Sequence, residues 1–165
     1  MTKRRVLHGI EIFCLMIIIG LLVACQGNVL SYQGELVEEK NQVPLKSGGP
    51  HSEVWNTRNV ILSYEYINEA DRLDISGEVA LAGGVENFQK VEHLEVNLYF
   101  VDGNGRIIEY APLFSAVTQD MGKNWTFQRK IEKPAGAESM AFGYSGQVQS
   151  VGQDQDRFDF WETPI

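Results

Sequence analysis

Alternation of hydrophobic and polar residues dominates the chain from residue 59 onward. Every second residue from Val60 to Tyr66 is hydrophobic, and residues 73–81 and 91–101 repeat the same period of two. This period is typical of strands that bury one face. Weaker versions predict strands at residues 106–110, 113–118, 125–131 and 139–148. The pattern therefore predicts about seven short strands and no convincing amphipathic helix.

A turn signal separates two of these strands. Residues 102–105 read Asp-Gly-Asn-Gly, two overlapping dipeptides that tolerate positive φ and favour a tight hairpin. Short strands joined by such turns pack as two antiparallel sheets. We therefore expect an all-β sandwich domain over residues 59–165.

Residues 25–58 lack a comparable period. The stretch is polar and interrupted by glycine and proline, which predicts a flexible tether. A flexible chain of this length reaches roughly 30 Å in root-mean-square terms. We expect the tether to hold the domain clear of whatever anchors it.

The amino terminus has the pattern of a secretory signal. Lys3, Arg4 and Arg5 precede an uncharged apolar run over residues 12–24. This run is shorter than the roughly 20 residues that a membrane-spanning helix needs. It ends in Leu22-Val23-Ala24-Cys25, which resembles the lipobox of bacterial lipoproteins.

The lipobox resemblance implies that residues 1–24 are a cleaved lipoprotein signal peptide. It further implies that the sulfur of Cys25 carries a diacylglyceryl group and that palmitate or similar chains, two or three in all, hold the protein stably on a membrane. Gln26, rather than aspartate, favours the outer membrane facing the periplasm if the host is Gram-negative. An ordinary signal peptide cut elsewhere and an uncleaved signal anchor are the alternatives.

Charge and cysteine content narrow the class of protein. The formal net charge of the chain is −8, and removal of the signal makes it more negative, so binding to nucleic acid is not expected. Cys14 leaves with the signal and Cys25 carries the lipid. The domain therefore has no internal disulfide and depends on its hydrophobic core.

A family resemblance points to the type of sandwich. Residues 75–79 and 96–108, where a strand ending in an aromatic residue runs through Asp102 and Gly105 into a second strand, look like FxLYD-type domains. These are immunoglobulin-like sandwiches of secreted and lipid-anchored bacterial proteins. The likeness covers residues 59–148 and implies an immunoglobulin-like antiparallel β-sandwich without catalytic residues.

No motif for catalysis or metal binding is complete. Residues 143–147 depart from the G-x-S-x-G elbow of serine hydrolases at Gln147, and no histidine follows Ser145. His51 and His93 have no cysteine partners for zinc, and the acidic stretch from Asp154 to Asp159 lacks the glycine of a calcium loop. We expect no enzyme activity, no metal and no cofactor.

The carboxyl-terminal tail offers the strongest candidate for a contact with a partner. Phe158, Phe160 and Trp161 follow a polar stretch and lie close together in the sequence. We favour the interpretation that these rings cover an open end of the sandwich as an added strand or clasp. The alternative is an exposed aromatic anchor for a partner, because binding energy concentrates on such side chains.

These observations favour a membrane-anchored, non-enzymatic binding or structural module of the bacterial cell envelope. Its expected partners are the membrane, through the lipid, and another envelope protein, which could pair with an edge strand. The alternative is a carrier of a small hydrophobic ligand between the sheets.

Overall fold

A computed structural model describes residues 32–120, 125–151 and 156–165. The signal segment and the motif around Cys25 lie outside these described residues. The described part contains nine strands and two short 3-10 helices: η1 (Glu39–Asn41), β1 (Val43–Pro44), β2 (Gly48–Asn56), β3 (Val60–Asn68), β4 (Arg72–Leu81), η2 (Val85–Asn87), β5 (Lys90–Val101), β6 (Ile107–Asp120), β7 (Trp125–Glu132), β8 (Ser139–Gln149) and β9 (Arg157–Glu162). Within these ranges, no helix has the length and apolar composition needed to cross a bilayer.

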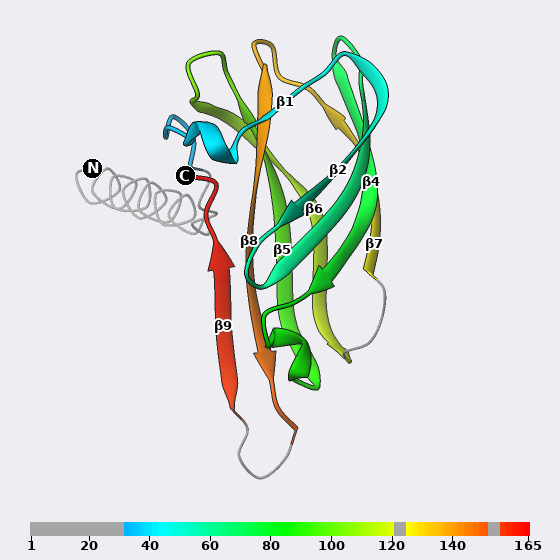
Figure 1. Cartoon of the computed structure of the whole chain (residues 1–165), viewed down its shortest axis with the longest axis vertical. Coiled ribbons are helices and arrows are strands. Elements are labelled where there is room, and N and C mark those ends of the chain that lie inside the picture. Colours follow the sequence, from blue (N-terminus) through cyan, green and yellow to red (C-terminus); the bar gives the residue numbers. More distant parts are fainter. Residues whose placement is uncertain (1–31, 121–124, 152–155) are drawn as a thin grey trace, which may run out of the picture. The chain divides into compact units, whose positions relative to one another are not determined.

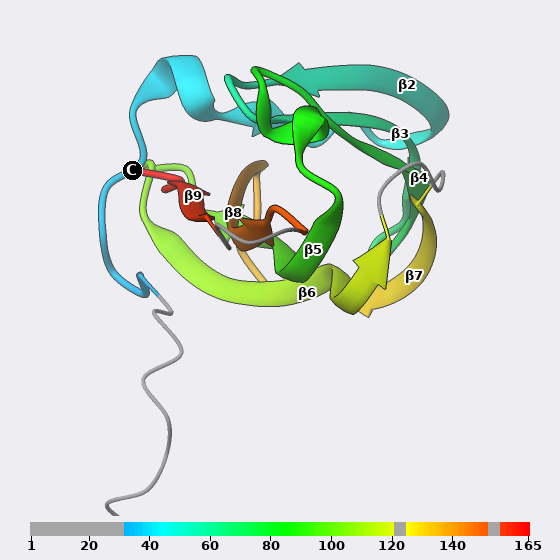
Figure 2. The same ribbon diagram turned by 90° about the horizontal axis from the view of Figure 1, so that it is seen from below.

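The strands form two antiparallel sheets that pack face to face (Figures 1 and 2). One sheet has the order β2-β3-β4-β7, and the other has the order β1-β8-β5-β6 with β9 also paired to β8. Strands β2, β3 and β4 form a meander in one sheet, and β5 and β6 form a hairpin in the other; β7 then pairs with β4, and β8 pairs with β5. These two pairs correspond to strands B–E and C–F of the immunoglobulin fold. The predicted all-β antiparallel sandwich is confirmed, and its described part has nine strands where about seven were expected.

Most predicted strands lie where the alternation placed them, but residues 107–120 form one strand, β6, where two were expected. Pro112 lies opposite Asn97, next to an irregularity in the β5–β6 register between Val96 and Asn97. Among the described strands, β6 pairs only with β5. Proline is tolerated on such an edge strand because no second neighbour needs its missing N–H group.

The expectation of a flexible tether is wrong for residues 32–58. Backbone N–H groups of Gly34 and Val37 donate to the carbonyls of Ile107 and Gly105 at 2.7 and 2.8 Å. The Val37 side chain is 2 % exposed and belongs to a small cluster with Tyr99 and Ile107. This segment is therefore fixed on the β5–β6 hairpin and belongs to the domain.

The rest of the expected tether supplies two strands. β1 pairs with the start of β8, and β2 pairs with β3 along most of its length. Side chains of His51, Glu53 and Trp55 alternate with more exposed neighbours, so β2 follows the same period of two as the other strands. Glycines and Pro50 at the beginning of β2 obscure this period in the sequence.

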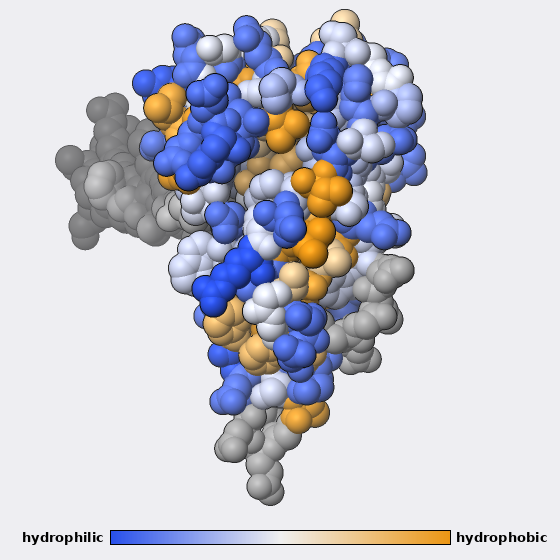
Figure 3. All heavy atoms as spheres, viewed as in Figure 1, coloured by the Kyte–Doolittle hydropathy of each residue, from blue (hydrophilic) through white to orange (hydrophobic). Residues whose placement is uncertain are grey.

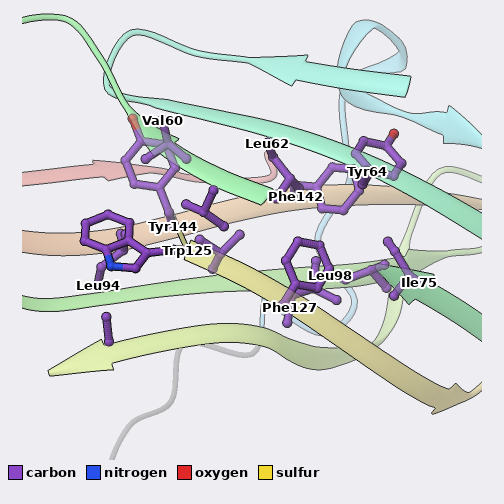
Figure 4. Close-up of a cluster of buried hydrophobic side chains, with 14 of the residues drawn as sticks. Val60, Leu62, Tyr64, Ile75, Leu94, Leu98, Trp125, Phe127, Phe142 and Tyr144 are labelled. Carbon is purple, nitrogen blue, oxygen red and sulfur yellow. The ribbon is translucent and has the colours of Figure 1, made fainter. Parts of the chain in front are cut away.

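The core between the sheets is rich in aromatic rings (Figure 4). Tyr64 of one sheet contacts Phe142 of the other with ring centroids 5.0 Å apart. Tyr66 and Phe100 are both fully buried. Figure 4 shows the side chains of both sheets pointing toward one another, so that they occupy the space between the layers. Because residues 32–165 contain no cysteine, this packing stabilises the sandwich without a disulfide.

Candidate functional site

Strand β9 carries all three aromatic residues that the sequence singles out, and their side chains differ in burial. It pairs with β8 from Arg157 opposite Gln149 to Glu162 opposite Tyr144. The tail therefore adds a strand to the sandwich, as the favoured interpretation predicted. Among the described strands, β9 has no neighbour other than β8, so its second edge is unpaired.

Phe160 is part of the core and is not available to a partner. Its side chain is 2 % exposed, and its ring lies 5.8 Å from the ring of Tyr144. A Cβ atom at Gly146 would lie 2.5 Å from this ring. The glycine therefore leaves the space that Phe160 fills when β9 docks on β8. The proposal of Phe160 as a partner contact is withdrawn.

Trp161 and Phe158 remain exposed on the same strand. Trp161 is 66 % exposed and lies opposite Ser145 in the register, on the outer face of the sheet. Phe158 is 44 % exposed, and its ring stacks near Phe88 at 6.1 Å. Of the three rings, Trp161 thus offers the most accessible apolar surface.

A second candidate site is a small cleft at the open side of the sandwich, where the end of β2 and the end of β9 approach η1. We call it the edge cleft. It has a volume of about 220 Å³. Its lining comes from η1, the end of β2, the β2–β3 turn, β8, the end of β9 and the residue after it: Asn41, Trp55, Asn56, Thr57, Arg58, Phe142, Glu162 and Thr163.

The base of the edge cleft is aromatic. The ring of Trp55, which is half-buried, lies 5.5 Å from Phe142 and 5.9 Å from Tyr144. Thr57 closes the neighbouring turn, because its hydroxyl donates to the Val60 carbonyl at 2.8 Å and accepts from the Val60 N–H at 3.1 Å. The base is therefore held by core packing on one side and by a capped turn on the other.

The rim carries opposite charges that act on the same phenol. Burial raises the pKa of Tyr144, and the Glu162 carboxylate raises it further, whereas the Thr57 hydroxyl and the Arg58 guanidinium oppose the shift. Lys40 on η1 also interacts with Glu162. The cleft thus brings an acidic and a basic side chain to the same aromatic base.

The edge cleft was missed because most of its residues lay in the stretch interpreted as a tether. Trp55, Asn56 and Arg58 are separated from Glu162 by about a hundred positions in the sequence, and only the sandwich brings them together. The available signal was the alternation of His51, Glu53 and Trp55, which marks a strand and turns the tryptophan inward.

A shallower depression lies on the outer face of the other sheet. Small side chains of Ser63 and Ser76 form part of it, between Val54 and Glu65. Figure 3 shows that hydrophilic side chains cover most of this view and that hydrophobic ones form a streak over β2 and β3. Val54, which is 63 % exposed, belongs to this face. Its exposed surface is mainly apolar, whereas the exposed lining of the edge cleft is mainly polar, so we regard the edge cleft as the better candidate.

The other residues considered from the sequence do not assemble into a site. His51 lies on β2 in one sheet and His93 lies on β5 in the other. Ser145 faces solvent on β8 opposite Trp161. Across the described ranges, no group of three histidine, cysteine or acidic side chains is arranged to hold a metal ion. Asp154 and Cys25 lie outside those ranges.

The fold and the two candidate surfaces define an immunoglobulin-like sandwich with an aromatic edge strand and a small polar cleft. Comparison of the chain with protein-family models, with curated proteins and with solved structures finds no match. The class therefore rests on strand order and packing, and the resemblance to FxLYD-type domains stays a prediction.

Proposed function

We propose that this chain is a membrane-anchored lipoprotein that acts as a non-enzymatic binding or structural module of the bacterial cell envelope. The basic amino terminus, the apolar run and the Leu22-Val23-Ala24-Cys25 motif support the anchor. The observation that carries the binding role is Trp161, which is 66 % exposed on the strand with an unpaired edge. Isolated tryptophan side chains of this kind are frequent anchors of protein interfaces.

The short link between Cys25 and the domain restricts the choice of partner. Backbone hydrogen bonds hold the chain on the domain from Gly34 onward, and residues 26–31 are all that separate Cys25 from Tyr32. Even a fully extended link of this length spans at most about 25 Å. The domain would therefore stay close to the membrane, and its partner would be an envelope protein that reaches the same surface.

Two modes of contact fit β9. A partner strand can add to its unpaired edge through backbone hydrogen bonds, and the Trp161 ring can fill a pocket on the partner. Asp159 and Gln147 flank this position, joined by a side-chain hydrogen bond of 2.6 Å. The combination of an apolar ring with a polar surround matches the usual composition of an interface.

Photo-crosslinking in living cells tests this proposal. A photoreactive phenylalanine analogue at position 161 is expected to give a defined protein adduct in the membrane fraction. The same analogue at Thr126, an exposed position on the other sheet, is the control and should not give that adduct. Adding Cys25→Ala should release the protein and abolish the adduct, whereas Cys14→Ala should not. Identical adducts from positions 161 and 126 would contradict the proposed contact.

A further inference from the structure

The backbone of β9 directs hydrogen-bonding groups away from β8 at every second residue. The N–H group of Ser150 donates to the Asp156 carbonyl at 3.0 Å, which continues the β8–β9 register by one pair. Pairs that exchange hydrogen bonds alternate with pairs that do not in an antiparallel ladder. The N–H and C=O groups of Arg157, Asp159 and Trp161 therefore point outward, where no other described strand meets them (Figure 1).

The side chains along this edge include both charges and two rings. Arg157 and Asp159 are exposed on one face of the strand, two positions apart, and Phe158 lies between them on the other face. Phe158 is 44 % exposed and Trp161 is 66 % exposed. A second copy that pairs antiparallel is related by a two-fold axis, so the same patch meets itself. Such a patch must be self-complementary, and a strand with an acid and a base on one face can be.

The side chains select a register for this self-pairing. Registers centred on Phe158, Asp159 or Phe160 let at least two outward residues of each copy bond to the other copy. Centring on Asp159 places two carboxylates directly opposite each other, and centring on Phe160 places Glu162 opposite the Phe158 ring. Centring on Phe158 instead brings Arg157 opposite Asp159 on both sides of the axis and pairs the two Phe158 rings. Opposite charges and aromatic pairs stabilise neighbouring strands, whereas like charges destabilise them.

The other strand edges are less suited to self-pairing. β6 contains Pro112, which lacks an N–H group. Lys133 donates to the Asp71 carbonyl at 2.8 Å and Thr57 to the Val60 carbonyl at 3.0 Å, which fixes the outward positions of β7 and β2 in the same way. These positions carry no aromatic ring: Thr126, Gln128, Lys130 and Glu132 on β7, and Ser52, Val54 and Asn56 on β2.

We propose that β9 pairs with β9 of a second copy of this chain, antiparallel and centred on Phe158, so that one sheet continues across both copies. The inference rests on the proposed function, because it names the partner of the same strand. An edge of six residues buries less than the roughly 1,200 Å² of a standard interface, so the pairing is weak in solution. Two copies anchored on one membrane have a higher effective concentration, which favours the pair.

Disulfide trapping of the full chain in isolated membranes tests the proposal. Residues 32–165 contain no cysteine, so Phe158→Cys introduces a single thiol into the domain. Opposite Cα atoms at this kind of position lie about 4.5 Å apart, within the span of a disulfide. Oxygen with copper phenanthroline takes up the two electrons and two protons of each thiol pair. The expected product is a dimer of twice the chain mass that a reductant dissociates.

Two further cysteine variants are controls. Val117→Cys, at a position 67 % exposed on β6, should remain monomeric. Asp159→Cys should give little dimer, because its counterpart in the second copy is displaced by two positions and about 7–8 Å away. Dimer from Asp159→Cys without dimer from Phe158→Cys would overturn the register.

Charge exchange within the Phe158→Cys variant tests the pairing itself. Arg157→Asp and Asp159→Arg each place like charges opposite and should lower the yield of dimer about fivefold or more, since two charge pairs change sign. The two exchanges together restore opposite charges and should restore the yield. All variants should unfold at similar temperatures in reductant.

The self-pairing is overturned if Phe158→Cys gives no dimer, if Val117→Cys gives as much, or if the double exchange restores nothing. A different protein captured by the photoreactive group at position 161, without a dimer through position 158, would overturn the self-pairing and leave the proposed binding function intact. Failure of both experiments would count against both proposals.

Discussion

At the residue scale, the three tail aromatics should separate into one core residue and two surface residues. Phe160→Ala removes a ring that is 2 % exposed and should lower the free energy of unfolding by about 3 kcal/mol. Trp161→Ala changes a mostly exposed side chain and should cost less than about 1 kcal/mol. Urea denaturation of both variants measures the difference. Equal losses would mean that Trp161 is packed and is no candidate for a partner contact.

A second residue-scale prediction concerns alkaline pH. Burial raises the pKa of Tyr99 to about 12, from a value near 10 for the unfolded chain. Between these values the unfolded chain loses the phenolic proton and the folded chain keeps it, so rising pH favours unfolding. The stabilising contribution is complete below pH ~10 and is lost as pH rises through about 12.

The measurement is the free energy of unfolding as a function of pH, with Tyr99→Phe as the comparison. The variant should lose stability less steeply in this range. Part of the slope should remain, because burial also raises the pKa of Tyr64. A variant whose profile has the same slope as the original would show that Tyr99 ionises normally in the folded protein.

At the element scale, the segment before β1 should contribute to stability, unlike a tether. Val37 is 2 % exposed and its neighbour Leu36 is 59 % exposed, which provides a matched pair. Val37→Asp places a charge inside a small apolar cluster and should cost about 3 kcal/mol or more. Leu36→Asp should cost less than about 1 kcal/mol. Thermal or urea unfolding measures the stability of both variants. If neither substitution lowers the stability, the segment before β1 does not contribute to the fold and is a tether.

Among the individual elements, the period of two predicted the strands whose positions follow from backbone pleating alone. β3, β4 and β5 have strong alternation and β7 and β8 have weaker alternation, and all five lie within a residue or so of their predicted bounds. β2 was missed because its beginning carries two glycines and Pro50, and β1 was missed because two residues leave no period to detect. Their pairing is decided by neighbouring strands rather than by their own sequence.

The edge cleft was beyond sequence reasoning for a related reason. Its parts derive from strand order, which places the β2–β3 turn beside the end of β9, and local patterns contain no information about that order. By contrast, the alternation of a strand predicts that Phe160 and Trp161 face opposite sides of β9. Only the pairing of β9 with β8 shows that Phe160 is the buried residue.

At the scale of the whole molecule, anchoring and recognition are placed at different sites. The proposed lipid would be attached to Cys25, before residue 32, whereas Trp161 lies on β9 near the other end of the chain. If the proposed anchor holds the domain close to a membrane, the domain would meet a partner only within a restricted range of distances from that membrane. The proposed envelope protein on the same membrane fits this restriction.

The anchor depends on the chemistry of one residue, Cys25, and mass spectrometry of the protein extracted from membranes tests it most directly. The predicted result is a mature chain that begins at Cys25 and carries the mass of a diacylglyceryl group. A chain that retains residues 1–24, or one that begins elsewhere with an unmodified amino terminus, would contradict the account.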